Sequence, residues 1–122
     1  MIVIGVDVHK QSLTAAAVDE LGRVFAEWSG PVERGVVAWA RALGEERLWA
    51  LEDCRHVTRG LEQELLDAAE RLVRVPPRLT APQRRRGRVR GKSDRIDALA
   101  VARAALQVPE LERPRPGEAV MR

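Results

Sequence analysis

Two aspartates three residues apart are the residues of this chain best placed to do chemistry. Asp94 and Asp97 stand in GKSDRIDALA (91–100), where an alanine-rich run follows them. Ser93 is a favourable N-cap, so the segment predicts a helix over residues 94–106 with both carboxylates on one face. Two carboxylates directed at one point suit a metal ion. The alternative is that Asp94 only complements the helix dipole and Asp97 is solvated.

Further acids stand near the ends of two predicted strands. Residues 2–8 form a β-branched run that contains Asp7, and residues 47–54 return to strand character with Glu52 and Asp53 near the end. Side chains alternate along a strand, so Glu52 and Asp53 point to opposite faces, and the pattern leaves open which of them joins Asp7. Acids at the ends of neighbouring strands can lie close together, with the 94–106 helix above them.

A shared site for four carboxylates needs positive charge. Like charges about 4 Å apart repel by roughly 4 kcal/mol at an effective dielectric constant of 20. Oxygen-only ligands favour hard ions, so the sequence predicts Mg²⁺ or Mn²⁺ and no organic cofactor. Two such ions can bridge a phosphate and support in-line phosphoryl transfer.

The elements that must position these acids follow from hydrophobic periodicity. Strands are expected at residues 2–8, 13–18, 23–28, 47–54 and 72–75, and helices at residues 32–43, 58–71 and 94–106. Short turns join the first three strands, whereas helices link the later ones. The order predicts an α/β fold with a mixed five-stranded sheet, in which an antiparallel meander adjoins parallel strands and helices flank the sheet.

Charge is segregated along the 122-residue chain. Residues 71–92 hold nine basic residues and no acid, which leaves 12 bases against 18 acids, a net charge of −6, in the rest. A basic segment on an acidic body is typical of a nucleic-acid partner, although arginine is abundant throughout. We expect residues 76–92 to form a flexible arm. Its candidate nucleic-acid-binding residues are Arg84, Arg85, Arg86, Arg88, Arg90 and Lys92.

Composition excludes several other classes. The single cysteine, Cys54, excludes an intramolecular disulfide framework, and one thiol with two histidines makes no zinc site. We therefore expect a reducing, cytoplasmic compartment. No segment is apolar enough to span a membrane, and aromatic residues are too scarce for a base-stacking platform. Residues 108–122 are rich in proline and predict a linker or tail.

Four segments together resemble the N-terminal DEDD domain of bacterial insertion-sequence transposases of the one-hundred-and-ten class. They are GVDVHK (5–10), LEDC (51–54), VPP (75–77) and GKSDRIDA (91–98), and the resemblance extends to about residue 106. It implies a RuvC-like, RNase H-type fold that cleaves DNA and exchanges strands with bound Mg²⁺. It also implies a catalytic, metal-binding tetrad, in which Glu52 rather than Asp53 matches the family's glutamate. The tetrad is Asp7, Glu52, Asp94 and Asp97.

The chain departs from this family in length. Family members are longer and carry a C-terminal domain with a serine thought to act with the tetrad. The resemblance thus implies a catalytic domain over residues 1–107 that lacks its C-terminal partner domain and is incomplete alone. The family works with a structured guide RNA, so RNA is a possible partner besides DNA. We also expect a homo-oligomer.

Other interpretations remain open at this point. The same fold can serve a junction resolvase-like nuclease that is complete in itself, or a nucleic-acid-binding remnant without catalysis. A nucleotide-binding domain of the actin and sugar-kinase type also has an acid in its first strand. That class needs small residues after the acid, and Val8, His9 and Lys10 offer no glycine. His9 either contacts a phosphate or water, or makes a local hydrogen bond.

Overall fold

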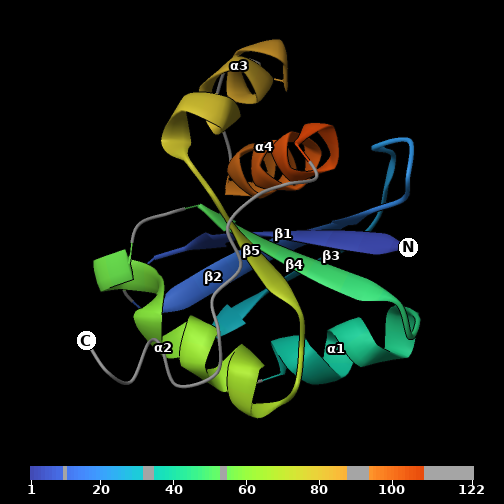
Figure 1. Cartoon of the computed structure of the whole chain (residues 1–122), viewed down its shortest axis with the longest axis vertical. Helices are drawn as coiled ribbons and strands as arrows, with labels where there is room; N and C mark the ends of the chain where they lie inside the picture. The colour runs from blue at the N-terminus through green and yellow to red at the C-terminus, as the bar shows by residue number, and fades with distance from the viewer. Residues whose placement is uncertain (10, 32–34, 53–54, 88–93, 109–122) are drawn as a thin grey trace.

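The computed structural model describes residues 1–9, 11–31, 35–52, 55–87 and 94–108, with only the backbone described at 55–57, 84–87 and 94–96. These residues form five strands and four helices (Figure 1). In chain order they are β1 (Ile2–Val8), β2 (Ser12–Val18), β3 (Val24–Pro31), α1 (Val36–Leu43), β4 (Arg47–Glu52), α2 (Arg55–Asp67), β5 (Leu72–Val75), α3 (Pro77–Gly87) and α4 (Asp94–Gln107).

The five strands form one mixed sheet in the order β3-β2-β1-β4-β5. Strands β1, β2 and β3 pair antiparallel, while β4 is parallel to both β1 and β5. The connections explain this order, because tight turns join antiparallel strands and helices join parallel ones. The predicted α/β fold with a mixed five-stranded sheet is confirmed.

Helices cover both faces of the sheet (Figure 1). On one face α1 and α2 cover a core that includes Ile4 and Val6 of β1. On the other face α4 covers a second core that includes Val3, and α3 packs against α4. Strand β1 therefore contributes alternate side chains to the two cores, as a central buried strand must.

Helix α3 is the largest departure from the predicted structure. The prediction of a flexible arm over residues 76–92 is wrong for Pro77–Gly87, which form this helix. Pro77 suits a first helical position, Leu79 packs against the second core and Thr80 is fully buried. Burial of this first turn supplies the stability that the arginine-rich sequence does not indicate. Residues 88–92 lie outside the described part of the chain.

Other boundaries shift because of local geometry. Helix α2 spans Arg55–Asp67 instead of the predicted 58–71, and Ala69 adopts a positive φ of 62° just after it. This left-handed conformation ends the helix and lets the chain turn into β5. Strand β3 runs on to Pro31 because Ser12 pairs with it.

A buried carboxylate ties the start of β4 to the segment between α2 and β5. Glu70 is 7% exposed and accepts a hydrogen bond of 2.8 Å from Nε1 of the buried Trp49. Arg47 approaches the same carboxylate to 2.7 Å and Arg41 to 3.2 Å. Trp49 is fully buried in the core, whereas Trp28 and Trp39 are only partly buried.

We expect this network to make the fold sensitive to acid. Burial raises the pKa of Glu70, but hydrogen bonds from Arg47, Trp49 and Arg41 outweigh it and lower the pKa from 4.5 to about 2. A carboxyl group with a lowered pKa stabilises the fold above its unfolded-state pKa. That contribution, about 3 kcal/mol, is lost as the pH falls from about 4.5 toward 2.

Denaturant unfolding between pH 7 and pH 2.5 measures this loss. The Glu70→Gln variant is expected to be less stable at pH 7 and to show a flatter decline toward low pH. Equal pH slopes for the variant and the unmodified chain would show that other groups govern acid unfolding.

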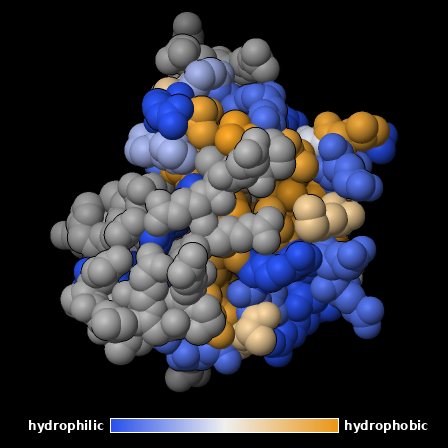
Figure 2. All heavy atoms as spheres, in the orientation of Figure 1, coloured by the Kyte–Doolittle hydropathy of each residue, from blue (hydrophilic) through white to orange (hydrophobic). Residues whose placement is uncertain are grey.

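Hydrophilic residues dominate the described surface in Figure 2, and hydrophobic residues gather mainly below α3 and near the centre of the view. Two large apolar side chains are exposed in the β2–β3 hairpin, Leu21 and Phe25. None of the described helices combines the length and hydrophobicity needed to cross a membrane.

Candidate metal and nucleic-acid site

Two predicted site residues lie at the carboxyl ends of neighbouring parallel strands. The register pairs Val6 of β1 with Leu51 of β4, so Asp7 and Glu52 are the next residues on strands about 4.8 Å apart. Leu48 and Ala50 of β4 belong to the core beneath α4, and alternation places Glu52 on this same face. Asp7 lies on the same face, because it is four residues beyond Val3 of β1, which also belongs to the core beneath α4. Asp53 lies outside the described residues.

Helix α4 brings a third acid to this face. A Cβ atom on Gly5 would lie 2.1 Å from the carbonyl oxygen of Ala98 and 2.5 Å from the amide nitrogen of Ala102. The helix backbone thus rests directly on β1, two residues before Asp7, because glycine carries no side chain. Asp97 immediately precedes Ala98 and is only 7% exposed.

Asp94 occupies the first residue of α4, one turn before Asp97. Its backbone is described but its side chain is not, and the predicted N-cap Ser93 lies outside the described residues. The structure therefore brings the elements that carry all four predicted acids to one region, and describes the side chains of Asp7, Glu52 and Asp97 there.

The described acids each engage local partners. The Nε2 atom of His9 lies 3.1 Å from Oδ2 of Asp7, a distance at which a protonated imidazole forms an ion pair with a carboxylate. The Thr80 hydroxyl of α3 donates a hydrogen bond to Oε2 of Glu52. Among the side chains that the structure describes, no three from His, Cys, Asp and Glu are grouped closely enough to hold a metal ion.

The predicted nucleic-acid-binding residues fall at the end of α3 and beyond it. Arg84, Arg85 and Arg86 belong to α3, but their side chains are not described. The remaining three lie outside the described part of the chain, and they are Arg88, Arg90 and Lys92.

The basic segment is less uniform than its sequence indicates. Arg74 is 3% exposed on β5, where its guanidinium lies 3.1 Å from the carboxylate of Glu62, itself buried in α2. This arginine is paired inside the protein and does not contribute to a nucleic-acid-binding surface.

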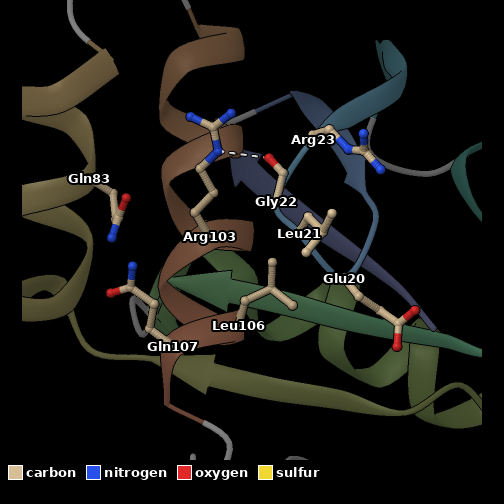
Figure 3. Close-up of a pocket in the computed structure, with 8 residues that line it drawn as sticks. All are labelled: Glu20, Leu21, Gly22, Arg23, Gln83, Arg103, Leu106 and Gln107. Atoms are coloured by element: carbon tan, nitrogen blue, oxygen red, sulfur yellow. Dashed lines mark hydrogen bonds between the residues drawn. The ribbon is translucent and has the colours of Figure 1, made fainter.

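A cavity of about 500 Å³ lies beside the other end of α4 (Figure 3). Gln83 of α3 and Gln107 of α4 line it together with the β2–β3 turn, where Nε of Arg103 donates a hydrogen bond of 3.0 Å to the carbonyl oxygen of Gly22. Arg103 is six residues beyond Asp97, or about 9 Å along the helix. Asp7, Glu52 and Asp97, the predicted site residues whose side chains the structure describes, do not line this cavity.

The strand order, the mixed pairing and the helices on both faces define an RNase H-like fold of the RuvC type. A solved structure of T. thermophilus RuvC in complex with a Holliday junction substrate superposes on the chain with a TM-score of 0.65. It shares 14% sequence identity, and the alignment covers 93% of this chain and 99% of that one. This likeness shows the fold.

The family model described as a transposase, of the DEDD type found in IS110 elements, matches residues 4–122. The chain belongs to this transposase family. It is therefore a RuvC-like domain of the DNA transposition and recombination machinery. Comparison with curated proteins gives no match.

Sequence reasoning did not identify two residues that shape this site. Thr80 donates a hydrogen bond to Glu52 from a segment predicted to be a flexible arm. The sequence Thr-Ala-Pro at 80–82, within a basic stretch, contains no motif that would indicate this contact. Gly5 permits the close approach of α4. The signal for Gly5 was its position two residues before Asp7 in a β-branched strand, where glycine often marks a close backbone approach.

Proposed function

We propose that this domain cleaves DNA phosphodiester bonds with Mg²⁺ or Mn²⁺ held by Asp7, Glu52, Asp94 and Asp97. The observation that carries the proposal is the register of β1 and β4, which sets Asp7 and Glu52 side by side on the face that α4 covers. The buried Asp97 approaches the same face from α4. Membership of the transposase family supplies the reaction class.

The chemistry of these residues suits a hard divalent cation. The candidate ligands are all carboxylates, which are the ligands that Mg²⁺ and Mn²⁺ prefer. Gathering them in one place without a cation is unfavourable, because their charges repel. When bound, the ion supplies charge stabilisation at the phosphate and activation of an oxygen nucleophile.

The protein's own residues have separate roles in this proposal. Asp7 and Glu52 bind from the rigid central strands, while Asp94 and Asp97 bind from the first turns of α4. The Thr80 hydroxyl holds the carboxylate of Glu52 before the metal binds, and the imidazole of His9 lies beside the carboxylate of Asp7.

We propose DNA as the partner of this site. The RuvC structure similar to this chain holds a DNA junction, and the basic residues from Arg84 to Lys92 directly precede α4 in the chain. Lysine and arginine at these positions can contact phosphates and so position the strand to be cut. A guide RNA, a C-terminal partner domain and assembly into a homo-oligomer remain predictions from the sequence.

Calorimetric titration of Mn²⁺ and Mg²⁺ into the purified chain tests the metal site. We expect saturable Mn²⁺ binding that weakens at least about tenfold in Asp7→Asn and in Asp97→Asn, since each substitution removes a ligand charge. Asp67→Asn is the matched control, because Asp67 is an exposed acid in α2 that accepts a hydrogen bond from Gln63. Binding that is unaffected by the first two substitutions would contradict a site shared by β1 and α4.

Nicking of a branched DNA in the presence of Mn²⁺ tests the reaction. If the domain is a nuclease complete in itself, it is expected to nick the junction, and Asp7→Asn is expected to abolish the nicking. A transposase domain that needs further residues binds the junction without cutting it. Failure to bind both DNA and metal would contradict the proposed function.

A further inference from the structure

We propose that Thr80 is a positioning residue for Glu52, so that helix α3 forms part of the proposed metal site. The inference rests on that proposed function and extends it to a residue outside the four acids. The contact that carries it is the hydrogen bond from the Thr80 hydroxyl to Oε2 of Glu52.

The topology explains why Thr80 reaches Glu52. Strand β5 lies beside β4, and their register pairs Val75 with Glu52 at the ends of the two strands. The chain then turns into α3, which packs against α4 on the face where Glu52 lies. Thr80 is five residues beyond Val75, in the first turns of that helix, and this path returns its side chain to the end of β4.

Local packing fixes the hydroxyl in place. Thr80 has no exposed surface, and its neighbour Leu79 packs against the core beneath α4. The amide of Leu79 donates a hydrogen bond of 2.9 Å to the carbonyl oxygen of Pro76, which anchors the start of the helix. A threonine held in this way loses little further freedom when it orients a carboxylate.

The chemistry of the pair suits support of a metal ligand. A carboxylate has two oxygens, so a donor at Oε2 fixes the plane of the Glu52 group while its ligand function is retained. Residues that hydrogen-bond a ligand in this way orient it, and their loss typically costs about 10- to 100-fold in metal affinity. Oγ1 of Thr80 also lies 3.0 Å from the carbonyl oxygen of Pro77. The single hydroxyl proton therefore has a second acceptor if Glu52 shifts on binding.

The test compares Thr80→Val, which removes the hydroxyl and keeps the branched shape, with Thr80→Ser, which keeps the hydroxyl. We expect the Mn²⁺ affinity to fall about 10- to 100-fold in Thr80→Val and to recover largely in Thr80→Ser. A packing role alone predicts the opposite order, because serine loses the methyl group that valine retains. If Thr80→Val does not unfold cooperatively, Thr80→Ala replaces it.

A metal-free double-mutant cycle with Glu52→Ala tests the contact separately. We expect the change in unfolding midpoint of the double variant to be smaller than the sum of the changes in Thr80→Val and Glu52→Ala. Either single substitution already breaks the same hydrogen bond. Additive changes in the midpoint, or an Mn²⁺ affinity of Thr80→Val equal to that of the unmodified chain, would overturn this inference but leave the proposed metal site intact. Absence of Mn²⁺ binding by the unmodified chain would overturn the proposed metal site and this inference with it.

Discussion

Replacement of Gly5 by alanine is expected to destabilise the fold by about 3 kcal/mol or more, at or above the upper end of the usual range for overpacking. The added Cβ would lie 2.1 Å from the carbonyl oxygen of Ala98 and 2.5 Å from the amide nitrogen of Ala102. Both atoms belong to the backbone of α4, so a change of side-chain rotamer does not relieve the overlap. The helix must move away from β1 as a unit.

The same displacement is expected to weaken the candidate site. Asp97 adjoins Ala98, the residue nearest to the added methyl group, and therefore moves with the helix. Mn²⁺ titration of Gly5→Ala is expected to show weaker binding even under conditions in which the variant is folded. The metal measurement thus reports on the position of α4, separately from the loss of stability.

Gly60 provides the matched control for this substitution. It lies within α2, and apart from its chain neighbours and the backbone of its own helix, a Cβ atom there would meet no described atom within 4 Å. Gly60→Ala is expected to stabilise the protein by about 0.5–1 kcal/mol, because alanine is the better helix former. Denaturant unfolding of both variants checks the pair of expectations. A Gly5→Ala variant as stable as the unmodified chain would show that α4 does not rest on β1.

Loss of the buried Arg74 is the second large effect that we expect. Arg74 on β5 and Glu62 on α2 are both at most 3% exposed, and their charged groups lie 3.1 Å apart. Arg74→Met leaves the Glu62 carboxylate buried without this guanidinium, which typically costs about 3–5 kcal/mol. Thermal and denaturant unfolding measure the loss.

Simultaneous replacement of both partners separates the cost of an unpaired charge from the value of the pair. The double variant Glu62→Leu with Arg74→Met is expected to recover most of the lost stability, because two apolar side chains replace the two charges. A double variant as unstable as Arg74→Met alone would show that the pair acts through packing rather than charge. DNA binding by the double variant is expected to stay unchanged, since Arg74 is buried.

The buried pair also alters the interpretation of charge in this chain. In sequence, Arg74 belongs to the acid-free run of residues 71–92 and counts toward a nucleic-acid-binding segment. In the structure it neutralises Glu62 between β5 and α2. The proposal of DNA binding therefore depends on other basic residues of this run, of which Arg84, Arg85 and Arg86 belong to the second half of α3.

The amino-acid sequence by itself determined the order of the strands and of the described helices other than α3. β-branched runs, glycine turns and helical periodicity are short-range signals, and they predicted β1 and β5 with the bounds that the structure has. The same signals located Asp7 near a strand end and Asp97 in the first turns of a helix. The mixed sheet followed, because short turns and helical crossovers permit few arrangements.

Tertiary structure alone decided which groups meet. The alternation of β4 left Glu52 and Asp53 equivalent, and only its register with β1 and the packing of α4 show that Glu52 shares the face of Asp7. Helix α3 forms because its first turn is buried, a long-range effect that an arginine-rich segment does not reveal. Contacts such as Thr80 with Glu52 join residues far apart in the chain. Their partners are set by how the strands and helices pack, and local patterns carry no information about that packing.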